Sequence, residues 1–365
     1  MAMVRRLLLP VLIVFGLGSA VYLAQLRGDR DPSGKGETSD NDAAETAGRE
    51  QAWVRELGNT PGRDALLSLR KKLAGKPRRE AIAAIEEFLG RGSDRATGME
   101  LRVGRGGTIE GWPTLRVFLL DLLLEIDPGA AARISRGILA AESSADEWAI
   151  ALRNVARGEG PGADRDYLRK RTEALIANPE WQARPSIGYL NAFDVLVYAK
   201  ATETQPLLSG LVRRKDRPDL AHAAFLTLDR LVQREPVEML TRLKGDRALQ
   251  KSRPQMTAQQ FARADLRDNS QRAIVRSWLL DPSRTSTELE NFSAIYPNNN
   301  KLISDNLLTS EQQVPGADLQ AHDREVLAVI RGWRGDPVFE TRDRYLEVME
   351  RRVSRFVKEA AGSSR

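Results

Sequence analysis

Apolar positions recur at helical spacing along most of the chain. A clear example is the set Leu66, Leu69 and Leu73, three and four positions apart. Such spacing places the side chains on one face of an amphipathic helix. The run from Leu115 to Ile126 is apolar nearly all round, which predicts a helix buried between neighbours.

Residue pairs that end in proline punctuate this pattern where one helix should give way to the next. They are Asp127-Pro128, Asn178-Pro179, Arg217-Pro218, Glu235-Pro236, Asp281-Pro282, Tyr296-Pro297 and Asp336-Pro337. Proline disfavours helix at the residue before it and is tolerated in the first helical turn, so each pair predicts a joint. Ser144, followed by Asp146 and Glu147, predicts a helix N-cap.

Several of these pairs are about 40 residues apart, a period typical of paired-helix repeats. Between about Arg63 and Leu308 the chain resembles HEAT-like and tetratricopeptide-like α-solenoids in this periodicity, although no repeat consensus matches it residue for residue. The resemblance implies an all-α fold of stacked helix pairs with a long curved binding surface. An irregular multi-helix bundle is the alternative, and function does not follow from architecture.

One segment departs from the helical pattern. Apolar and polar residues alternate from Met99 to Val103, glycines surround Arg105, and Thr108 to Glu110 resume the alternation. This predicts one short β-hairpin inserted near residues 99–110. The glycines would also suit anion binding, but no phosphate-loop lysine follows them, and a hairpin turn is favoured.

The N-terminal residues 1–26 predict a signal anchor or transmembrane helix. The twenty residues from Leu7 to Leu26 carry no formal charge and would span ~30 Å as a helix. Arg5 and Arg6 precede them, so the positive-inside rule predicts a single-pass protein with a cytoplasmic N-terminus and a periplasmic, or otherwise extracytoplasmic, bulk. A cleaved signal peptide is the alternative, although the apolar run continues past the small residues 18–20.

Three further segments follow the anchor. Residues 27–47 hold almost no large apolar side chain, which predicts a disordered linker. Residues 48–310 form the predicted helical-repeat domain, and residues 311–365 a C-terminal helical pair. In the last helix Phe339, Leu346, Met349, Val353 and Phe356 share one stripe. That stripe would either cap the domain or form a short coiled coil in a homo-oligomer.

The composition is that of a folded protein. Of 365 residues, 41% are hydrophobic and 29% are charged, which excludes wholesale disorder. The net charge of +6 is the small difference between 56 basic and 50 acidic residues. Because no aromatic residues are interleaved with the basic runs, we expect no nucleic-acid partner.

Candidate catalytic residues are few. The chain has no cysteine, which excludes thiolate metal sites and cysteine nucleophiles. His222 is expected to be partly buried inside a helix and His322 to be solvated. Residues 68–71 and 304–306 match the S-x-x-K and S-D-N elements of penicillin-binding proteins, but the third element, K-T-G, is missing. We therefore predict no catalytic residue, no cofactor and no metal site.

Basic residues cluster in three places, as candidate partner-binding faces. These are Arg70, Lys71 and Lys72; Arg213, Arg214 and Lys215; and Arg351, Arg352 and Arg355. Such faces would attract an acidic partner or anionic lipid headgroups. Ordinary solvated helix surface is the alternative.

The sequence as a whole favours a membrane-anchored helical-repeat scaffold or adaptor that binds protein partners outside the cytoplasmic membrane. One alternative is a helical-fold envelope enzyme that acts on glycan or peptidoglycan through paired carboxylates. Another is an oligomeric assembly subunit that associates through its last helix.

Overall fold

The computed structural model describes residues 52–362. All the elements below belong to the second of two units, Met1–Arg55 and Glu56–Arg365, except α3 (Ala52–Glu56), which crosses the boundary between them. The predicted anchor and linker, residues 1–47, lie outside the described residues. Among residues 52–362, no helix has the length and apolar character needed to cross a bilayer.

The second unit is mostly helical, which confirms the predicted all-α class. Its α-helices are α4 (Arg63–Ala74), α5 (Arg78–Gly90), α6 (Leu115–Ile126), α7 (Pro128–Ile138), α8 (Ala145–Glu159), α9 (Arg165–Ala177), α10 (Pro179–Ala183), α11 (Ile187–Ala192), α12 (Asp194–Ala199), α13 (Gln205–Val212), α14 (Pro218–Arg234), α15 (Pro236–Gly245), α16 (Arg247–Ser252), α17 (Pro254–Phe261), α18 (Asn269–Leu280), α19 (Ser286–Ile295), α20 (Gly316–Arg334) and α21 (Asp343–Gly362). Proline is the first residue of α7, α10, α14, α15 and α17, as expected where its missing N–H has no helical partner.

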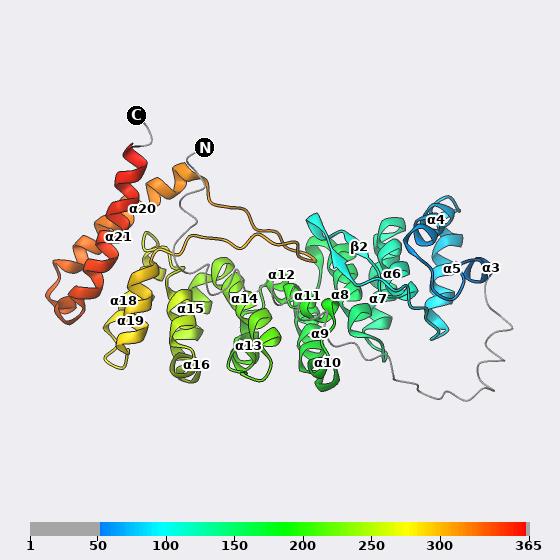
Figure 1. The fold of residues 1–365 in the computed structure, drawn as a ribbon, viewed down its shortest axis with the longest axis horizontal. Helices are drawn as coiled ribbons and strands as arrows, with labels where there is room; N and C mark the ends of the chain where they lie inside the picture. Colours follow the sequence, from blue (N-terminus) through cyan, green and yellow to red (C-terminus); the bar gives the residue numbers. More distant parts are fainter. Residues whose placement is uncertain (1–51, 363–365) are drawn as a thin grey trace. The chain divides into compact units, whose positions relative to one another are not determined.

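Helices that are neighbours in sequence are also neighbours in space (Figure 1). The helix α8 packs on α6, α7 and α11, α14 packs on α13 and α15, and α21 packs on α19 and α20. In α6 nine consecutive residues are buried, from Leu115 to Leu123. Its nearly uniform apolar pattern is explained by this burial on several sides.

The predicted N-cap at Ser144 is confirmed, because its Oγ accepts a hydrogen bond from the backbone N–H of Glu147 at 3.2 Å. Replacing Ser144 with alanine should lower the free energy of unfolding by about 1 kcal/mol, since that N–H loses its partner. The neighbouring Ser143 is a matched control: its buried hydroxyl has no hydrogen-bond partner, so Ser143→Ala should be neutral or slightly stabilising. Urea unfolding followed by circular dichroism would compare them, and equal losses would contradict the cap's role.

The predicted β-hairpin is also present. Strands β1 (Arg102–Val103) and β2 (Ile109–Gly111) pair antiparallel around the 3₁₀ turn η2 (Arg105–Gly107). Gly106 and Gly107 have φ of 67° and 74°, a left-handed conformation that glycine adopts without strain. The first strand is shorter than predicted, because residues 99–101 lie outside the ladder.

The apolar stripe near the C-terminus finds partners within the chain. Leu346, Met349 and Val353 of α21 are fully buried, where α21 packs on α19 and α20. Phe339 precedes them in the 3₁₀ helix η5 (Pro337–Arg342) and is also buried. This burial is the pattern expected of a capping helix, while association of the chain through α21 stays a prediction.

Candidate functional site

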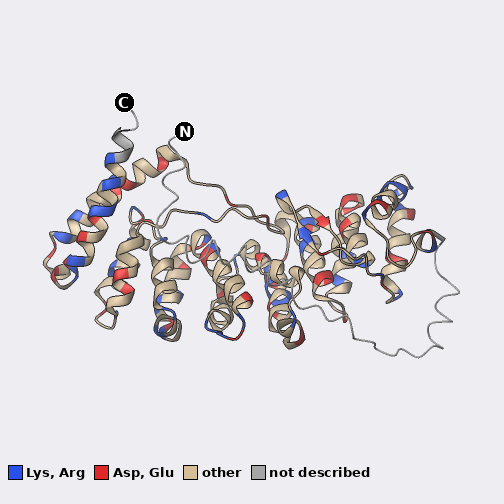
Figure 2. Cartoon of the chain, in the orientation of Figure 1, with Lys and Arg blue, Asp and Glu red and all other residues tan. Residues whose placement is uncertain are grey.

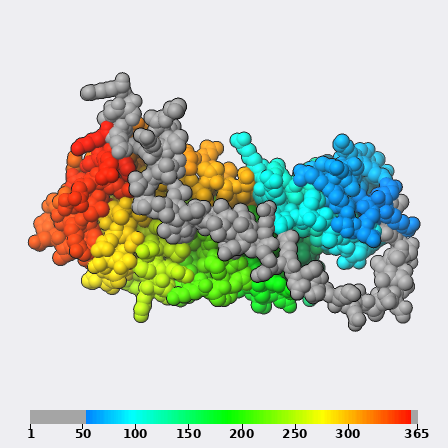
Figure 3. Space-filling view, in the orientation of Figure 1, coloured from blue at the N-terminus to red at the C-terminus, as the bar shows by residue number. Residues whose placement is uncertain are grey.

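A long irregular stretch joins α19 to α20, and we call residues 296–315 the connecting segment. It contains no helix or strand. Structureless loops of more than ~12–15 residues are uncommon in folded domains unless they serve a function. Figure 1 shows the connecting segment in orange, running from α19 towards the β-hairpin and back to α20. Figure 3 shows part of it on the surface beside the cyan hairpin.

The outgoing limb of the connecting segment is held at its start by Arg263, just after α17. The Arg263 Nη1 donates to the carbonyl oxygen of Asn298 at 2.9 Å and also to that of Asn300. The backbone N–H of Asn298 donates to the Ala262 carbonyl at 2.9 Å. Asp229 of α14 orients the Arg263 guanidinium by accepting hydrogen bonds from its Nε and Nη2 at 2.9 Å each. This bidentate pair orients the guanidinium towards the segment.

The tip of the connecting segment meets the β-hairpin and α8. The Arg157 Nη2 donates to the carbonyl oxygens of Leu307 at 3.0 Å and Gly106 at 2.6 Å. Burial lowers the pKa of the Arg157 guanidinium, and the nearby Arg153 lowers it further. A Cβ atom at Gly107 would collide with both Arg157 and the Leu307 carbonyl. A glycine is therefore required where the β-hairpin contacts the tip of the connecting segment.

The returning limb is anchored on Asp194, the first residue of α12. The backbone N–H groups of Leu308 and Thr309 donate to the Asp194 Oδ2 at 2.7 and 3.0 Å. The Thr309 hydroxyl donates to the Asp194 Oδ1 and accepts from Arg230 of α14. Arg230 also donates to the Asp194 Oδ1 at 2.8 Å. Thr309 therefore closes a buried polar cluster that two helices have already built.

Glu311 follows in a basic environment. Its carboxylate lies 2.9 Å from the Arg234 Nη2, 3.6 Å from the Arg230 Nε and 3.9 Å from the Lys301 Nζ. The Glu311 side chain is only 8% exposed, so these charges interact with little screening by water. Arg234 also contacts the Ser310 carbonyl at 3.4 Å. The limbs of the segment are joined by Gln313, whose Nε2 donates to the Lys301 carbonyl at 2.8 Å.

We name Arg157, Asp194, Arg230, Arg234 and Arg263 the segment-binding face. Arg157, Arg234 and Arg263 donate to carbonyl groups. Arg230 donates to the Thr309 hydroxyl, and Asp194 accepts from consecutive backbone N–H groups. Every peptide unit offers such groups whatever its side chain, except for the missing N–H of proline. The face is therefore chemically equipped to hold an extended polypeptide. Among residues 52–362, no group of three or more potential ligands is placed to hold a metal ion.

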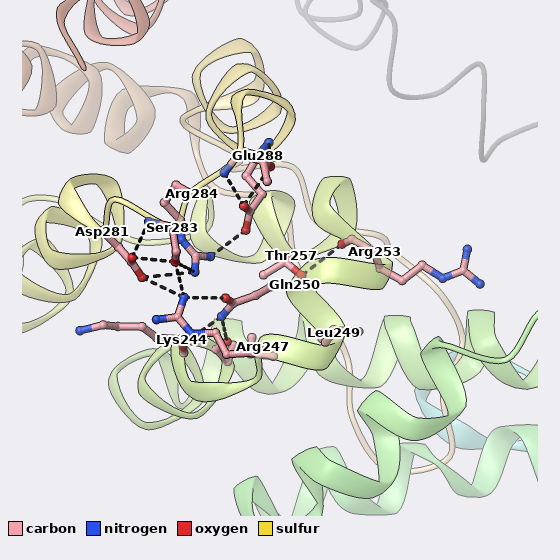
Figure 4. A network of polar contacts seen from close by, with 12 residues as sticks. Lys244, Arg247, Leu249, Gln250, Arg253, Thr257, Asp281, Ser283, Arg284 and Glu288 are labelled. Atoms are coloured by element: carbon pink, nitrogen blue, oxygen red, sulfur yellow. Dashed lines mark hydrogen bonds and ion pairs between the residues drawn. The ribbon is translucent and has the colours of Figure 1, made fainter. Parts of the chain in front are cut away.

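Two other polar clusters act as joints between helices. In Figure 4, Arg247 of α16 donates to Asp281 and Ser283 at 2.9 and 2.8 Å. Partial burial raises the pKa of Asp281, but hydrogen bonds from Ser283 and Arg247 outweigh it and hold that pKa well below its usual range. Near α6, Asp121 accepts from Trp112, Arg70 and Arg153. In both clusters the central carboxylate is held by donors from within the cluster, as is usual for buried polar groups.

Asp121 and Glu125 are neighbouring carboxylates of the kind that the enzyme alternative requires. Asp121 and Glu125 share Arg70, which lies 3.3 Å from each. Partial burial raises the pKa of Glu125, and Asp121 raises it further, although Arg70 opposes both. Both oxygens of the Asp121 carboxylate are occupied by its three donors.

Asp146 of α8 has a pKa raised by burial, which outweighs hydrogen bonds from the Ser186 hydroxyl at 2.7 Å and the Gly188 N–H at 2.8 Å. The folded chain thus binds this proton more tightly than the unfolded chain does. The charged form consequently destabilises the fold above the folded pKa, and this destabilisation fades as the pH falls towards 3.8, the ordinary pKa of an aspartate.

Asp146→Asn should therefore raise the melting temperature at pH 7, with a gain that shrinks towards pH 4. The asparagine Oδ1 can still accept both hydrogen bonds, so only the charge is removed. Thermal unfolding across this pH range would measure the effect, with the exposed Glu142→Gln as a control. A lower melting temperature of Asp146→Asn at pH 7 would show instead that the charge stabilises the fold.

The burial predicted for the two histidines is confirmed for His222 and wrong for His322. His222 lies half-buried in α14, as predicted, and burial lowers its pKa. The prediction that His322 is solvated is wrong, since this side chain of α20 is only 7% exposed. Its ring lies 3.2 Å from Asp323, 3.7 Å from Asp265 and 3.4 Å from the Asn299 amide. Two of these neighbours come from other parts of the chain and cover the ring.

The three predicted basic clusters are not brought together. Arg70 lies on α4, the Arg213–Lys215 cluster in the turn between α13 and α14, and Arg351 on α21, while α4 packs on α5 and α6 and α21 on α19 and α20. Figure 2 shows basic and acidic residues interspersed along the helices. As binding residues the clusters stay a prediction.

Several cluster members have internal partners. Arg70 pairs with Asp121 and lies over the Trp112 ring at 5.2 Å. Lys72 and Arg214 pair with Glu56 and Asp216 at 2.6 and 2.5 Å, and Arg351 lies 3.6 Å from Glu347. Burial lowers the pKa of Arg352, while Lys71, Arg213, Lys215 and Arg355 are exposed.

Sequence reasoning missed the segment-binding face, although two signals were present. Asp194 precedes the apolar run Val195 to Val197, and Asp229-Arg230 interrupt the apolar positions of α14. Charged residues inside apolar runs are typical of buried ion pairs. The second signal is the length of the stretch from Pro297 to Pro315, which exceeds an ordinary helix joint. The predicted boundary between residues 310 and 311 falls within it.

Comparison with known proteins finds no match: no family model, no curated protein and no solved structure resembles the chain significantly.

Proposed function

We propose that this protein is a membrane-anchored helical-repeat adaptor, of HEAT-like or tetratricopeptide-like α-solenoid type, that binds protein partners outside the cytoplasmic membrane. The succession of helices that pack on their neighbours in sequence supports the repeat architecture. The apolar N-terminal run with its preceding arginines supports the anchor and the orientation.

The observation that carries the binding function is the way the connecting segment is held. An extended backbone lies across side chains from α8, α12, α14 and the end of α17, without forming a strand. Repeat proteins commonly bind extended chains across successive helices. The described residues offer no comparable observation in favour of the enzyme alternative, so the adaptor function is the one we propose.

Cross-linking in intact membranes followed by mass spectrometry tests this function. We expect reproducible capture of a partner protein, weakened by added salt if charged contacts contribute. Capture of copies of this chain alone would replace the adaptor with the assembly-subunit alternative. Robust turnover of a glycan by the purified protein would replace it with the enzyme.

A charge-reversal variant tests whether the basic turn between α13 and α14 contributes. Arg213, Arg214 and Lys215 would be replaced by glutamate together, and capture is expected to fall several-fold as long-range attraction becomes repulsion. Arg78→Glu with Arg79→Glu, on the exposed start of α5, is the control. Unchanged partner recovery in the turn variant would discard this cluster as a binding face.

A further inference from the structure

The returning limb of the connecting segment occupies a site with recognisable chemistry. We propose that the segment-binding face accepts an extended acidic segment of a second protein, with the pattern hydroxyl residue, any residue, acidic residue. In this inference, which rests on the adaptor function, Thr309-Ser310-Glu311 fills the site when no partner is bound.

The backbone contacts are not specific to this segment. Asp194 accepts the N–H groups of two consecutive residues, Leu308 and Thr309, through one carboxylate oxygen. Arg157 donates to the carbonyl of Leu307, on the N-terminal side of those N–H groups. Another chain in the same extended conformation offers the same groups in the same order. These contacts therefore fix the conformation and direction of the occupant and leave its sequence open.

The side-chain contacts select the pattern. The Thr309 hydroxyl both donates to Asp194 and accepts from Arg230, which only a hydroxyl residue can do in so small a space. Asp194 is 5% exposed, so a phosphorylated hydroxyl would place like charges together with little screening. The site therefore requires an unmodified serine or threonine at this position.

The acidic position is selected by charge. Glu311 lies beside the basic groups of Arg230, Arg234 and Lys301, of which Arg230 also pairs with Asp194. In addition, the Nε atoms of Arg230 and Arg234 are buried and make no hydrogen bond within the described residues. Two unused donors beside the bound carboxylate mean that the native glutamate does not saturate the site. A partner's acidic side chain placed closer would engage them.

The connecting segment is also suited to displacement. It is bound by side chains rather than by a β ladder, and its outgoing limb is partly free. Leu302 and Ile303 are 53% and 52% exposed, and their backbone groups have no hydrogen-bond partner in residues 52–362. Lifting the segment breaks a limited set of contacts, and a partner that remakes them offsets that cost.

A labelled peptide with the sequence of residues 304–314 tests the site by fluorescence anisotropy with the full-length protein in detergent. The double variant Thr309→Ala, Glu311→Lys weakens the internal occupant and leaves the face intact. We expect the peptide to bind this variant at least ~10-fold more tightly than the wild type, because a tethered competitor acts at an effective concentration of about millimolar.

Matched probes define the pattern. A peptide with lysine in place of Glu311 and a peptide phosphorylated at Thr309 should each bind at least ~10-fold more weakly than the parent peptide. Adding Arg234→Ala to the double variant should weaken peptide binding by a similar factor. Because the Arg234 side chain is 30% exposed, this substitution should leave the chain folded. Equal peptide affinity for the wild type and the double variant, or equal affinity of all three peptides, would overturn the proposal.

The membrane cross-linking experiment separates this inference from the adaptor function. Stronger capture of the partner by the double variant than by the wild type supports the site. Unchanged capture overturns the site while leaving the adaptor function in place. Absence of any partner overturns the adaptor function, and the peptide titration then still decides whether the face binds this pattern.

Discussion

Replacing Asp121 with alanine is expected to lower the free energy of unfolding by about 3–5 kcal/mol, the cost typical of breaking a buried ion pair from one side. The Asp121 side chain is 3% exposed and its Oδ1 accepts from Arg153 at 2.8 Å. Its Oδ2 accepts from the Trp112 Nε1 at 2.9 Å and from Arg70 at 3.3 Å. Alanine would leave the 5% exposed guanidinium of Arg153 buried without that partner.

Glu125→Ala is the matched control for this measurement. It removes another carboxylate 3.3 Å from the same Arg70, but its side chain is 53% exposed. An exposed ion pair contributes about 0–1 kcal/mol, so the control should unfold almost like the wild type. Urea titrations followed by circular dichroism give both values. Equal, small losses in the two variants would mean that α6 and α8 are not held together through Asp121.

Replacing Asp194 with alanine is expected to detach the returning limb of the connecting segment. The N–H groups of Leu308 and Thr309 lose their acceptor, and Arg230 loses its buried counter-charge. If the bound state of the segment is destabilised by about 3 kcal/mol or more, the equilibrium constant for its detachment rises at least ~100-fold. Tryptic cleavage after Lys301 and hydrogen exchange of residues 304–313 would both accelerate.

Two further variants make this result specific to the segment. Asp305→Ala removes an exposed carboxylate from the same stretch and should leave cleavage unchanged. Thr309→Val keeps the Asp194–Arg230 pair and removes only the bridging hydroxyl, so cleavage should accelerate by an intermediate amount while the helices stay folded. Cleavage in Asp194→Ala no faster than in Asp305→Ala would show that other contacts hold the segment.

The local elements were largely predictable because their causes lie close together in sequence. The start of α7 at Pro128 follows from the missing N–H of proline, and the start of α8 from the Ser144 cap. The hairpin turn follows from adjacent glycines that tolerate a left-handed backbone. The burial of α6 follows from its uniform apolar pattern.

Solvation of polar side chains was less predictable. His322 lies in a polar stretch of sequence, yet Asn299 and Asp265 fold over it from 23 and 57 positions away. The basic cluster at Arg70 was predicted as surface, but Arg70 itself pairs internally with Asp121, 51 positions along the chain. In both cases the exposure depends on neighbours that no local pattern specifies.

The sequence by itself thus determined the helical class, several helix boundaries and the hairpin, because hydrogen bonds in helices and tight turns join residues a few positions apart. Only the tertiary structure decided that Asp194 meets Arg230, 36 positions away, and Leu308, 114 positions away. Contacts at such separations depend on how successive helices stack and on the path of the connecting segment. The segment-binding face exists only once that stacking has aligned α8, α12, α14 and the end of α17.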